Sequence, residues 1–393
     1  MPDFLYEARC MAERIMGLRR DLHQCPETGN REFATARRLM TEMRQAGLPC
    51  RGYQTTAFSA ELAGALPGKT VALRADMDAL PITERTALSF ASRNEGMMHA
   101  CGHDIHMASA VGAAWLLCAH RDALHGRVRF LFQPDEEGRG GARAMIAAGC
   151  LEPDVAAVYG GHVSPDLPLG SVGIRYGAFY AASVPFTVTV CGKACHAAMP
   201  ERGIDALCCA AEMISALDRL PSSVCGEPFV LRVCTVRAGH SENILADQAV
   251  FSGILRTFGE AARDRMKQML CDTVQATAQA YGAAVSVSFG DGYSGVVNDE
   301  ACAAQAEKSA RKLLGGSHVH RLGSPTMTTE DFGEFISACS GCFVHIGVGG
   351  DAPLHSADFA PDGEAAVFGA AFFAQLLWDV LQNDAENPTQ APS

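Results

Sequence analysis

The sequence lacks long apolar runs, blocks of like charge and internal repeats. Its most apolar late stretch, 365–381, is interrupted by Gly369, Gln375 and Asp379, whereas a membrane span needs about 20 predominantly apolar residues. We therefore predict an amphipathic terminal helix there and no membrane partner. The net charge of −12 comes from 44 acidic and 32 basic residues without any basic cluster, so we expect no nucleic-acid partner.

The N-terminal segment also lacks the apolar core of a secretory signal peptide. The chain has 16 cysteines, and in a long chain without such a signal they are typical of reduced thiols packed as small apolar side chains. We therefore expect a cytoplasmic protein. With 393 residues, of which 48% are apolar and 19% charged, the composition indicates an ordinary globular protein of two or three domains.

Apolar strands alternate with helical stretches along the first part of the chain. This pattern is typical of an α/β domain whose mostly parallel sheet has helices on both faces. The predicted strands are 70–74, 127–132 and 155–159, and the predicted helices are 105–120 and 141–148. The same pattern resumes near the C-terminus, with a helix at 300–314, a strand at 342–348 and the terminal helix.

The middle of the chain has a different order of elements, β-α-β-β-α-β, which is the ferredoxin-like unit. Its strands are predicted at 184–190, 229–236, 249–257 and 284–289, and its helices at 204–217 and 261–281. We predict that this unit, residues 183–292, is inserted into a catalytic domain formed by 1–182 and 293–393. Ligand pockets favour domain interfaces, so such an insertion commonly forms one wall of a cleft.

Four side chains that can bind metal fall within eight positions, at His99, Cys101, His103 and His106, with Asp104 among them. A lone histidine is more often structural than a ligand, but this clustering favours a metal site. Cysteine and histidine suit a borderline metal such as zinc, and the Asp104 carboxylate could orient one imidazole.

Acidic residues follow two of the predicted strands. Asp76 and Asp78 are two positions apart, so on an extended segment their side chains face the same way. Asp135, Glu136 and Glu137 would repel one another unless they are exposed or neutralised by a cation. Each segment in isolation is equally consistent with a solvated acidic turn. If the backbone is extended, Glu136 and Glu137 diverge, so one could bind a metal while the other handles a proton.

His162 and His355 also follow apolar strands. Each of these histidines is a weak signal alone. Catalytic groups in α/β sheets gather beyond the carboxyl ends of the strands, and this shared position favours one common site.

The ordered motifs resemble those of the dinuclear metal amidohydrolases, a family that includes hippurate hydrolases, N-acyl-amino-acid deacylases and plant auxin-conjugate hydrolases. The resemblance extends from about residue 10 to residue 380. It is carried by the segments 18–29, 74–81, 99–106, 133–137, 160–162 and 353–355. The inserted unit agrees with the smaller lid domain of that family, which often mediates dimerisation. The resemblance therefore implies a homo-oligomer, a dimer or a tetramer.

The resemblance also implies roles for individual residues. The implied metal ligands are Cys101, His103, Glu137, His162 and His355. Glu136 is the implied catalytic carboxylate and His196 the histidine that the lid domain supplies, while Asn243 and Arg256 match positions near the substrate carboxylate. Five protein ligands exceed the usual three of one catalytic zinc, which favours two ions per chain. Manganese or zinc is expected, with cobalt or nickel as alternatives.

The chain departs from the usual family pattern at Cys195, at Asp135 and at Leu245-Ala246. We predict metal-dependent hydrolysis of the amide bond of an N-acyl amino acid, which yields a carboxylate and a free amino acid. One alternative is a dipeptidase or aminopeptidase on the same scaffold. Others are a catalytically silent binding protein that retains the metal, and a hydrolase that uses Cys101 as its nucleophile.

Overall fold

The computed structural model describes residues 2–386, which form two compact units. The larger unit contains the residues up to Gly177, Val297–Ser324 and the chain from Glu334 onward. The smaller contains Ala178–Val296 and also Pro325–Gly333, which we predicted to belong to the catalytic domain. This late segment pairs with the start of the smaller unit, because the amide of Thr326 donates to the carbonyl of Phe179 at 2.9 Å.

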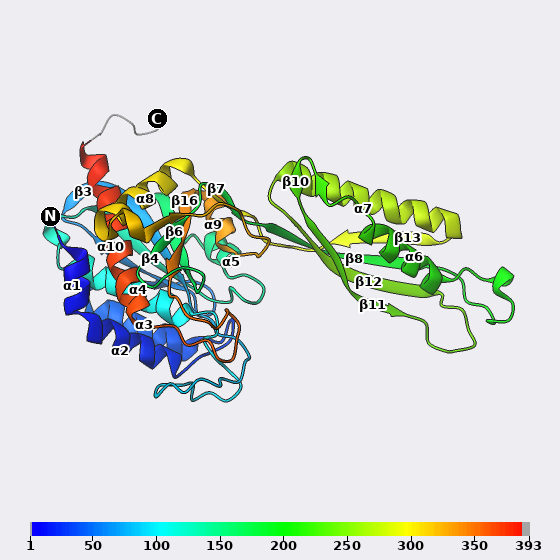
Figure 1. Cartoon of the computed structure of the whole chain (residues 1–393), viewed down its shortest axis with the longest axis horizontal. Helices are drawn as coiled ribbons and strands as arrows, with labels where there is room; N and C mark the ends of the chain where they lie inside the picture. The colour runs from blue at the N-terminus through cyan, green and yellow to red at the C-terminus, as the bar shows by residue number, and fades with distance from the viewer. Residues whose placement is uncertain (1, 387–393) are drawn as a thin grey trace. The chain divides into compact units, whose positions relative to one another are not determined.

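The larger unit is built on an eight-stranded sheet, and the predicted α/β fold class is confirmed (Figure 1). The strand order is β1-β2-β4-β3-β5-β16-β6-β15. The central run β4-β3-β5-β16 is parallel, whereas β2 pairs antiparallel with β1 and β4, and β6 pairs antiparallel with β16. The strands are β1 (Cys50–Gly52), β2 (Phe58–Ala63), β3 (Leu66–Asp76), β4 (His125–Gln133), β5 (Val155–Ser164), β6 (Val172–Ile174), β15 (Val319–Arg321) and β16 (Ser340–Gly347).

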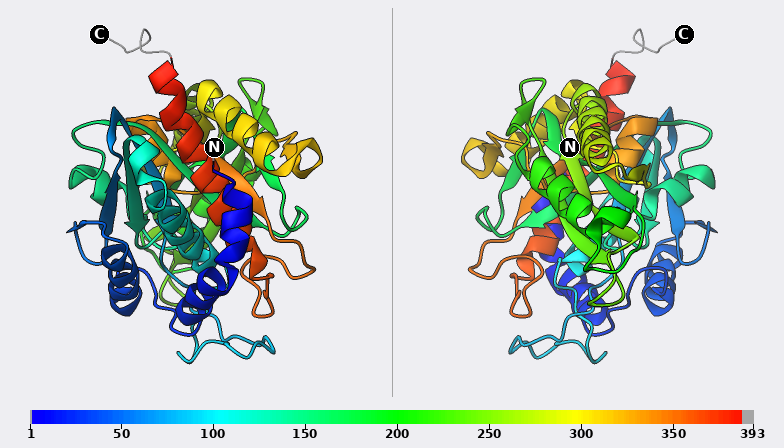
Figure 2. Two further views of the ribbon diagram at one scale, coloured as in Figure 1. Left: turned by 90° about the vertical axis from the view of Figure 1, so that its left-hand side faces the viewer. Right: turned by 90° about the vertical axis from the view of Figure 1, so that its right-hand side faces the viewer.

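Helices α4 and α10 pack against each other and against β3, and together they form the centre of the larger unit's core. Figure 2 shows α1 and α10 side by side in its left panel. The helices are α1 (Phe4–Cys10), α2 (Ala12–His23), α3 (Phe33–Gln45), α4 (His103–Cys118), α5 (Ala142–Ala147), α8 (Glu300–Leu314), α9 (Phe332–Ala338) and α10 (Glu364–Glu386), with short 3₁₀ turns at Arg121–Ala123 and Gly316–His318.

Helix α10 is a core helix, where we predicted an amphipathic one. By length and composition its residues Glu364–Gln382 would suffice to cross a membrane, yet 89% of this stretch is buried inside the protein. The polar positions do not mark a solvated face, because Asp379 is buried and accepts a hydrogen bond from Ser309 on α8 at 2.9 Å.

The smaller unit has a hydrophobic core of its own. Its elements follow the predicted β-α-β-β-α-β order: β8 (Ala182–Cys191), α6 (Ala206–Asp218), β11 (Val230–Ala238), β12 (Gln248–Thr257), α7 (Glu260–Tyr281) and β13 (Ala284–Phe289). The antiparallel sheet has the order β11-β12-β8-β13, and α6 and α7 cover one of its faces (Figure 1). Shorter pieces are β7 (Gly177–Tyr180), β9 (Ser223–Val224), β10 (Glu227–Pro228), β14 (Val296–Asn298) and a 3₁₀ turn at Pro200–Arg202.

The close crossing of α4 and α10 generates a stability prediction. A Cβ atom added at Gly112 on α4 would lie 2.7 Å from the Cβ of Ala370 on α10, whereas one added at Gly17 on α2 has no neighbour within 4 Å. Gly112→Ala should therefore destabilise the larger unit by about 1–2 kcal/mol through overpacking. Gly17→Ala should stabilise it by about 0.5–1 kcal/mol through helix propensity. Fluorescence during urea unfolding measures both, because the chain's 2 tryptophans, Trp115 and Trp378, lie in this unit. If Gly112→Ala and Gly17→Ala changed the free energy of unfolding equally and in the same direction, the close contact between α4 and α10 would be contradicted.

Candidate metal centre

The turn before α4 presents Cys101 and His103 on either side of a glycine. Gly102 adopts the left-handed conformation with φ of 82°, which residues with a side chain rarely adopt. A Cβ atom at Gly102 would also lie 2.5 Å from a methyl carbon of Val163 on β5. The Cys-Gly-His sequence is thus what lets this turn pack directly against β5.

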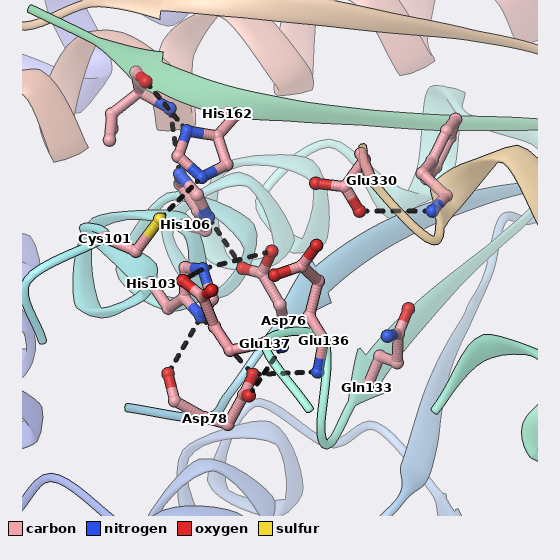
Figure 3. A network of polar contacts seen from close by, with 12 residues as sticks. Asp76, Asp78, Cys101, His103, His106, Gln133, Glu136, Glu137, His162 and Glu330 are labelled. Atoms are coloured by element: carbon pink, nitrogen blue, oxygen red, sulfur yellow. Dashed lines mark hydrogen bonds and ion pairs between the residues drawn. The ribbon is translucent and has the colours of Figure 1, made fainter. Parts of the chain in front are cut away.

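The acidic residues and His162 reach the same edge of the larger sheet from three neighbouring parallel strands. Asp76 ends β3, Glu136 and Glu137 follow β4, and His162 lies near the end of β5. Because carboxyl ends of parallel strands meet at one edge, these residues converge as the sequence analysis expected (Figure 3).

The structure brings the five predicted ligands together within the larger unit. The Cys101 Sγ lies 3.1 Å from the Nε2 of His162 and 3.2 Å from the Nε2 of His355. The Glu137 Oε1 lies 3.1 Å from the Nε2 of His355 and 3.9 Å from the Nε2 of His103. Two groups of three have ligand atoms within 4.8 Å of one another, Cys101/His103/His162 and Cys101/Glu137/His355, and Cys101 is common to both.

The side chains of these groups fit divalent cations. His103 Nδ1 lies 2.8 Å from the carbonyl of Asp78, and His162 Nδ1 lies 2.8 Å from the carbonyl of Val163. A proton on each Nδ1, donated to those carbonyls, leaves the Nε2 lone pair available for a metal. The Nε2 of His103 is buried and has no hydrogen-bond partner among the described residues, a costly state that a bound cation would relieve.

The electrostatics of the centre also favour a cation. Burial alone would lower the pKa of His103, but Asp76, Asp78 and Glu137 raise it to about 10. Burial raises the pKa of the Cys101 thiol well above its usual range, and the carboxylates of Glu137 and Glu136 raise it further. The site therefore attracts positive charge, and Cys101 needs such a charge nearby to act as a thiolate ligand.

The second acidic residue of the 76–78 pair, Asp78, shapes the turn after β4. Its two carboxylate oxygens accept the backbone N–H groups of Glu136 at 3.1 Å and of Glu137 at 3.0 Å (Figure 3). The polar atoms of Glu136, Glu137 and His103 lie within 4.8 Å of one another. Glu136 is buried beside the ligands without belonging to either group that contains Cys101.

His106 belongs to the framework of the centre. Its Nδ1 lies 2.6 Å from Asp76, its Nε2 accepts the N–H of Val163 at 2.9 Å, and Arg74 donates to the same Asp76 carboxylate at 2.8 Å. Burial would raise the pKa of Asp76, but His103, Arg74 and His106 hold it well below its usual range. Asp76 therefore ties β3 to α4 and, through His106, to β5.

Two residues of the 99–106 cluster, His99 and Asp104, belong to none of the groups of described side chains that could hold a metal. His99 is buried, both of its ring nitrogens lack a hydrogen-bond partner among the described residues, and burial lowers its pKa to about 3. The Asp104 carboxylate does orient an imidazole, but this imidazole is that of His23 on α2, at 2.9 Å, and Arg19 donates to the same oxygen. Spacing within 99–106 could not predict this contact, because the partners lie 81 and 85 positions away.

The other three predicted site residues belong to the smaller unit. The Nδ1 of His196 accepts the N–H of Ala198 at 3.1 Å. The side chain of Asn243 accepts a hydrogen bond from Ser241 at 2.6 Å. Arg256 donates to the carbonyl of Met327 at 2.6 Å, and its Nε is buried with no hydrogen-bond partner among the described residues.

The chain is similar to known proteins over most of its length. Residues 72–379 match the model of peptidase family M20/M25/M40. The chain is 36% identical to the N-acetylcysteine deacetylase of Bacillus subtilis over 94% of this chain and 97% of that protein. It is 37% identical to the N-acyl-L-amino acid amidohydrolase of Geobacillus stearothermophilus over 80% of this chain and 85% of that one. A solved dinuclear metal binding peptidase of Bacillus subtilis superposes with a TM-score of 0.85 at 35% identity, covering 95% of this chain and 99% of the other.

The buried ion pair at Asp76 generates a second stability prediction. Asp76→Ala would leave Arg74 and His106 buried without their carboxylate, which should destabilise the larger unit by about 3–5 kcal/mol. Glu13→Ala is the matched control, because Glu13 contacts Arg20 at 3.3 Å with 86% of its side chain exposed. Exposed pairs of this kind contribute about 0–1 kcal/mol. Tryptophan fluorescence during urea unfolding of the metal-free variants compares the two, and a similar loss for both would contradict the framework role of Asp76.

Proposed function

Because the chain belongs to peptidase family M20/M25/M40, we propose that this hydrolase cleaves the amide bond of an N-acyl amino acid, giving a carboxylate and a free amino acid. The observation that carries the proposal is the pair of ligand groups that share Cys101, with Glu136 buried beside them. The relatives named N-acetylcysteine deacetylase and N-acyl-L-amino acid amidohydrolase support the substrate class.

We propose that Cys101, His103, Glu137, His162 and His355 would hold two divalent ions, and Cys101 belongs to both groups of possible ligand atoms. Thiolate and imidazole ligands favour zinc, while the carboxylate also accepts manganese, and cobalt or nickel are alternatives. When bound, such ions lower the pKa of a water molecule and polarise the scissile carbonyl.

Glu136 is the proposed proton carrier. A carboxylate at this position accepts a proton from the attacking water and returns it to the leaving amine, a role that typically contributes about 10²- to 10⁴-fold to the rate. Its backbone amide is held by Asp78 at 3.1 Å, which fixes the start of the side chain. Glu137 is held in the same way at 3.0 Å, so Asp78 holds both consecutive carboxylate residues in place for different tasks.

The smaller unit would supply the groups that recognise the substrate. Since the Nδ1 of His196 accepts the amide of Ala198, a neutral imidazole carries its proton on Nε2 and can donate to a developing oxyanion. The forked donors of Arg256 suit the carboxylate of an amino acid, and its buried Nε lacks a partner among the described residues. Asn243 would contribute a further polar contact.

We further propose a cytoplasmic location, in keeping with 16 cysteines that are all free. The smaller unit would act as a lid domain, and the protein would form a dimer or a tetramer. A nucleophilic role for Cys101 is disfavoured, because burial and the neighbouring carboxylates raise the pKa of its thiol well above the usual range.

Substitution of the proton carrier tests the proposed function. Glu136→Gln should lower kcat by at least about 10²-fold, because the amide cannot accept a proton. Its metal content should equal that of the wild type. Glu137→Gln is the matched neighbour and should lose metal, because the carboxylate of Glu137 is a proposed ligand beside Cys101 and His355. Measurement of kcat and of bound metal by mass spectrometry separates the roles, and wild-type turnover in Glu136→Gln would contradict them.

A substrate panel separates the proposed activity from a peptidase on the same scaffold. Acetyl- and benzoyl-amino acids should be cleaved with kcat/KM at least about tenfold above that of dipeptides with the same C-terminal residue. The reason is that the free amino group of a dipeptide would need a polar partner in the site, whereas an acetyl or benzoyl group needs none. Free amino acid released from each substrate is measured by chromatography. A preference for dipeptides would instead support the dipeptidase alternative, and the release of no amino acid at all would support the binding protein.

A further inference from the structure

The residue before the paired glutamates has an unusual backbone. Asp135 adopts a φ of 57°, in the left-handed region that residues with a side chain rarely occupy. It lies two positions after the end of β4 and directly before Glu136. Such a conformation persists only where its surroundings hold it, and it often marks a functional site.

The carboxylate of Asp135 lies between two glycines. A Cβ atom added at Gly29 would lie 1.9 Å from the Asp135 Oδ1, and one added at Gly138 would lie 2.1 Å from the same oxygen. The other oxygen, Oδ2, accepts a hydrogen bond from the side chain of Asn30 at 2.7 Å and one from the N–H of Arg139 at 3.3 Å. A side chain at Gly29 or at Gly138 would therefore overlap the carboxylate of Asp135, and glycine at both positions leaves room for it.

The backbone of Asp135 is held as well. Its N–H donates to the Oε1 of Glu32 at 3.0 Å, and the same oxygen accepts the N–H of Asn30 at 3.0 Å. Glu32 is fully buried, and its second oxygen accepts a hydrogen bond from Thr56 at 2.6 Å. One buried carboxylate thus joins the turn after β4 to the segment that carries Asn30.

These contacts and those of Asp78 hold different groups of the same turn. Asp78 holds the N–H groups of Glu136 and Glu137, whereas Asn30 and Glu32 hold the side chain and the N–H of Asp135. A change in the conformation of the turn would therefore break hydrogen bonds of one set or the other. Asp135 itself is in none of the groups of described side chains that could hold a metal.

We propose that Asp135 and Asn30 are positioning residues, which fix the orientation of Glu136 and Glu137 through the hydrogen bond between their side chains. The inference rests on the proposed function for its catalytic consequence, but its structural part stands without it.

Four variants separate the side-chain contact from the backbone conformation. Asp135→Gly keeps a left-handed backbone at no steric cost but removes the carboxylate. Asp135→Asn keeps both, because asparagine tolerates the left-handed region and its side-chain oxygen can accept from Asn30. Asn30→Gly removes the donor and keeps the left-handed backbone that Asn30 adopts with φ of 60°. The fourth variant combines Asn30→Gly with Asp135→Gly.

The first readout is hydrogen–deuterium exchange of the metal-free protein, followed in peptides that cover residues 134–140. Exchange there should be about tenfold faster than in the wild type in Asp135→Gly and in Asn30→Gly. It should equal that of the wild type in Asp135→Asn, and peptides from α10 should show no change in any variant. The second readout is kinetic. The variant that lacks the carboxylate and the variant that lacks the donor should each lower kcat about tenfold, with KM within about twofold of the wild-type value. The combined variant should be no slower than either single variant, because both substitutions remove the same hydrogen bond between Asn30 and Asp135.

Wild-type exchange and kcat in Asp135→Gly would overturn the proposal. Equal damage from Asp135→Asn would also overturn it, since the conservative replacement must rescue a contact made through an acceptor oxygen. Multiplying effects in the combined variant would mean two independent roles and would contradict it too. A wild-type protein without hydrolytic activity would contradict the proposed function but not the positioning role of Asp135 and Asn30, because the exchange experiment needs neither metal nor substrate.

Discussion

The burial of carboxylates and a thiol at one sheet edge is the constraint on which the rest of the larger unit depends. Asp76, Asp78 and Glu136 are buried there, and Cys101 is buried with them. Negative charges in such a place need positive partners, because desolvation disfavours the charged form of each. The protein meets part of this need with Arg74, which donates to Asp76 at 2.8 Å. Without a metal the carboxylates raise the pKa of His103 to about 10, and a cation at its Nε2 would replace that proton. Two divalent ions would meet the remainder.

The architecture divides this task between the proposed ligands and the backbone groups behind them. The proposed ligands come from the turn before α4 and the first residue of α4, from the turn after β4, from the end of β5 and from the loop after β16. Behind them, backbone carbonyls face the Nδ1 atoms of His103 and His162, which leaves each Nε2 toward the centre. His355, held in a left-handed conformation with φ of 64°, donates its N–H to the carbonyl of Ala100 at 2.9 Å, so the late loop is tied directly to the Cys101 turn. Positions far apart in the chain are thereby fixed to one another through backbone contacts.

Sequence patterns predicted the elements and the ligand candidates better than they predicted the framework. The strand run that ends at Asp76 and the motifs around Cys101 and Glu137 are local signals, and parallel strands bring their ends together as a matter of topology. Contacts between distant residues leave no such signal. The pairing of Asp104 with His23 is one example, and the contact of Asn30 with Asp135 is another. Helix α10 was predicted as amphipathic because polar residues interrupt it, but buried partners on α8 satisfy Asp379.

Counting the metal ions that bind to metal-free protein tests the central claim most directly. Titration with Zn²⁺, followed by calorimetry, should give two equivalents per chain for the wild type. Cys101→Ala should lose tight binding at both sites, because its sulfur is common to both ligand groups, whereas His162→Ala should lose tight binding at one. Two tight equivalents in Cys101→Ala would contradict the shared thiolate. A metal-free wild-type protein that hydrolyses N-acyl amino acids without any added divalent ion would contradict the proposed metal centre and its role in hydrolysis.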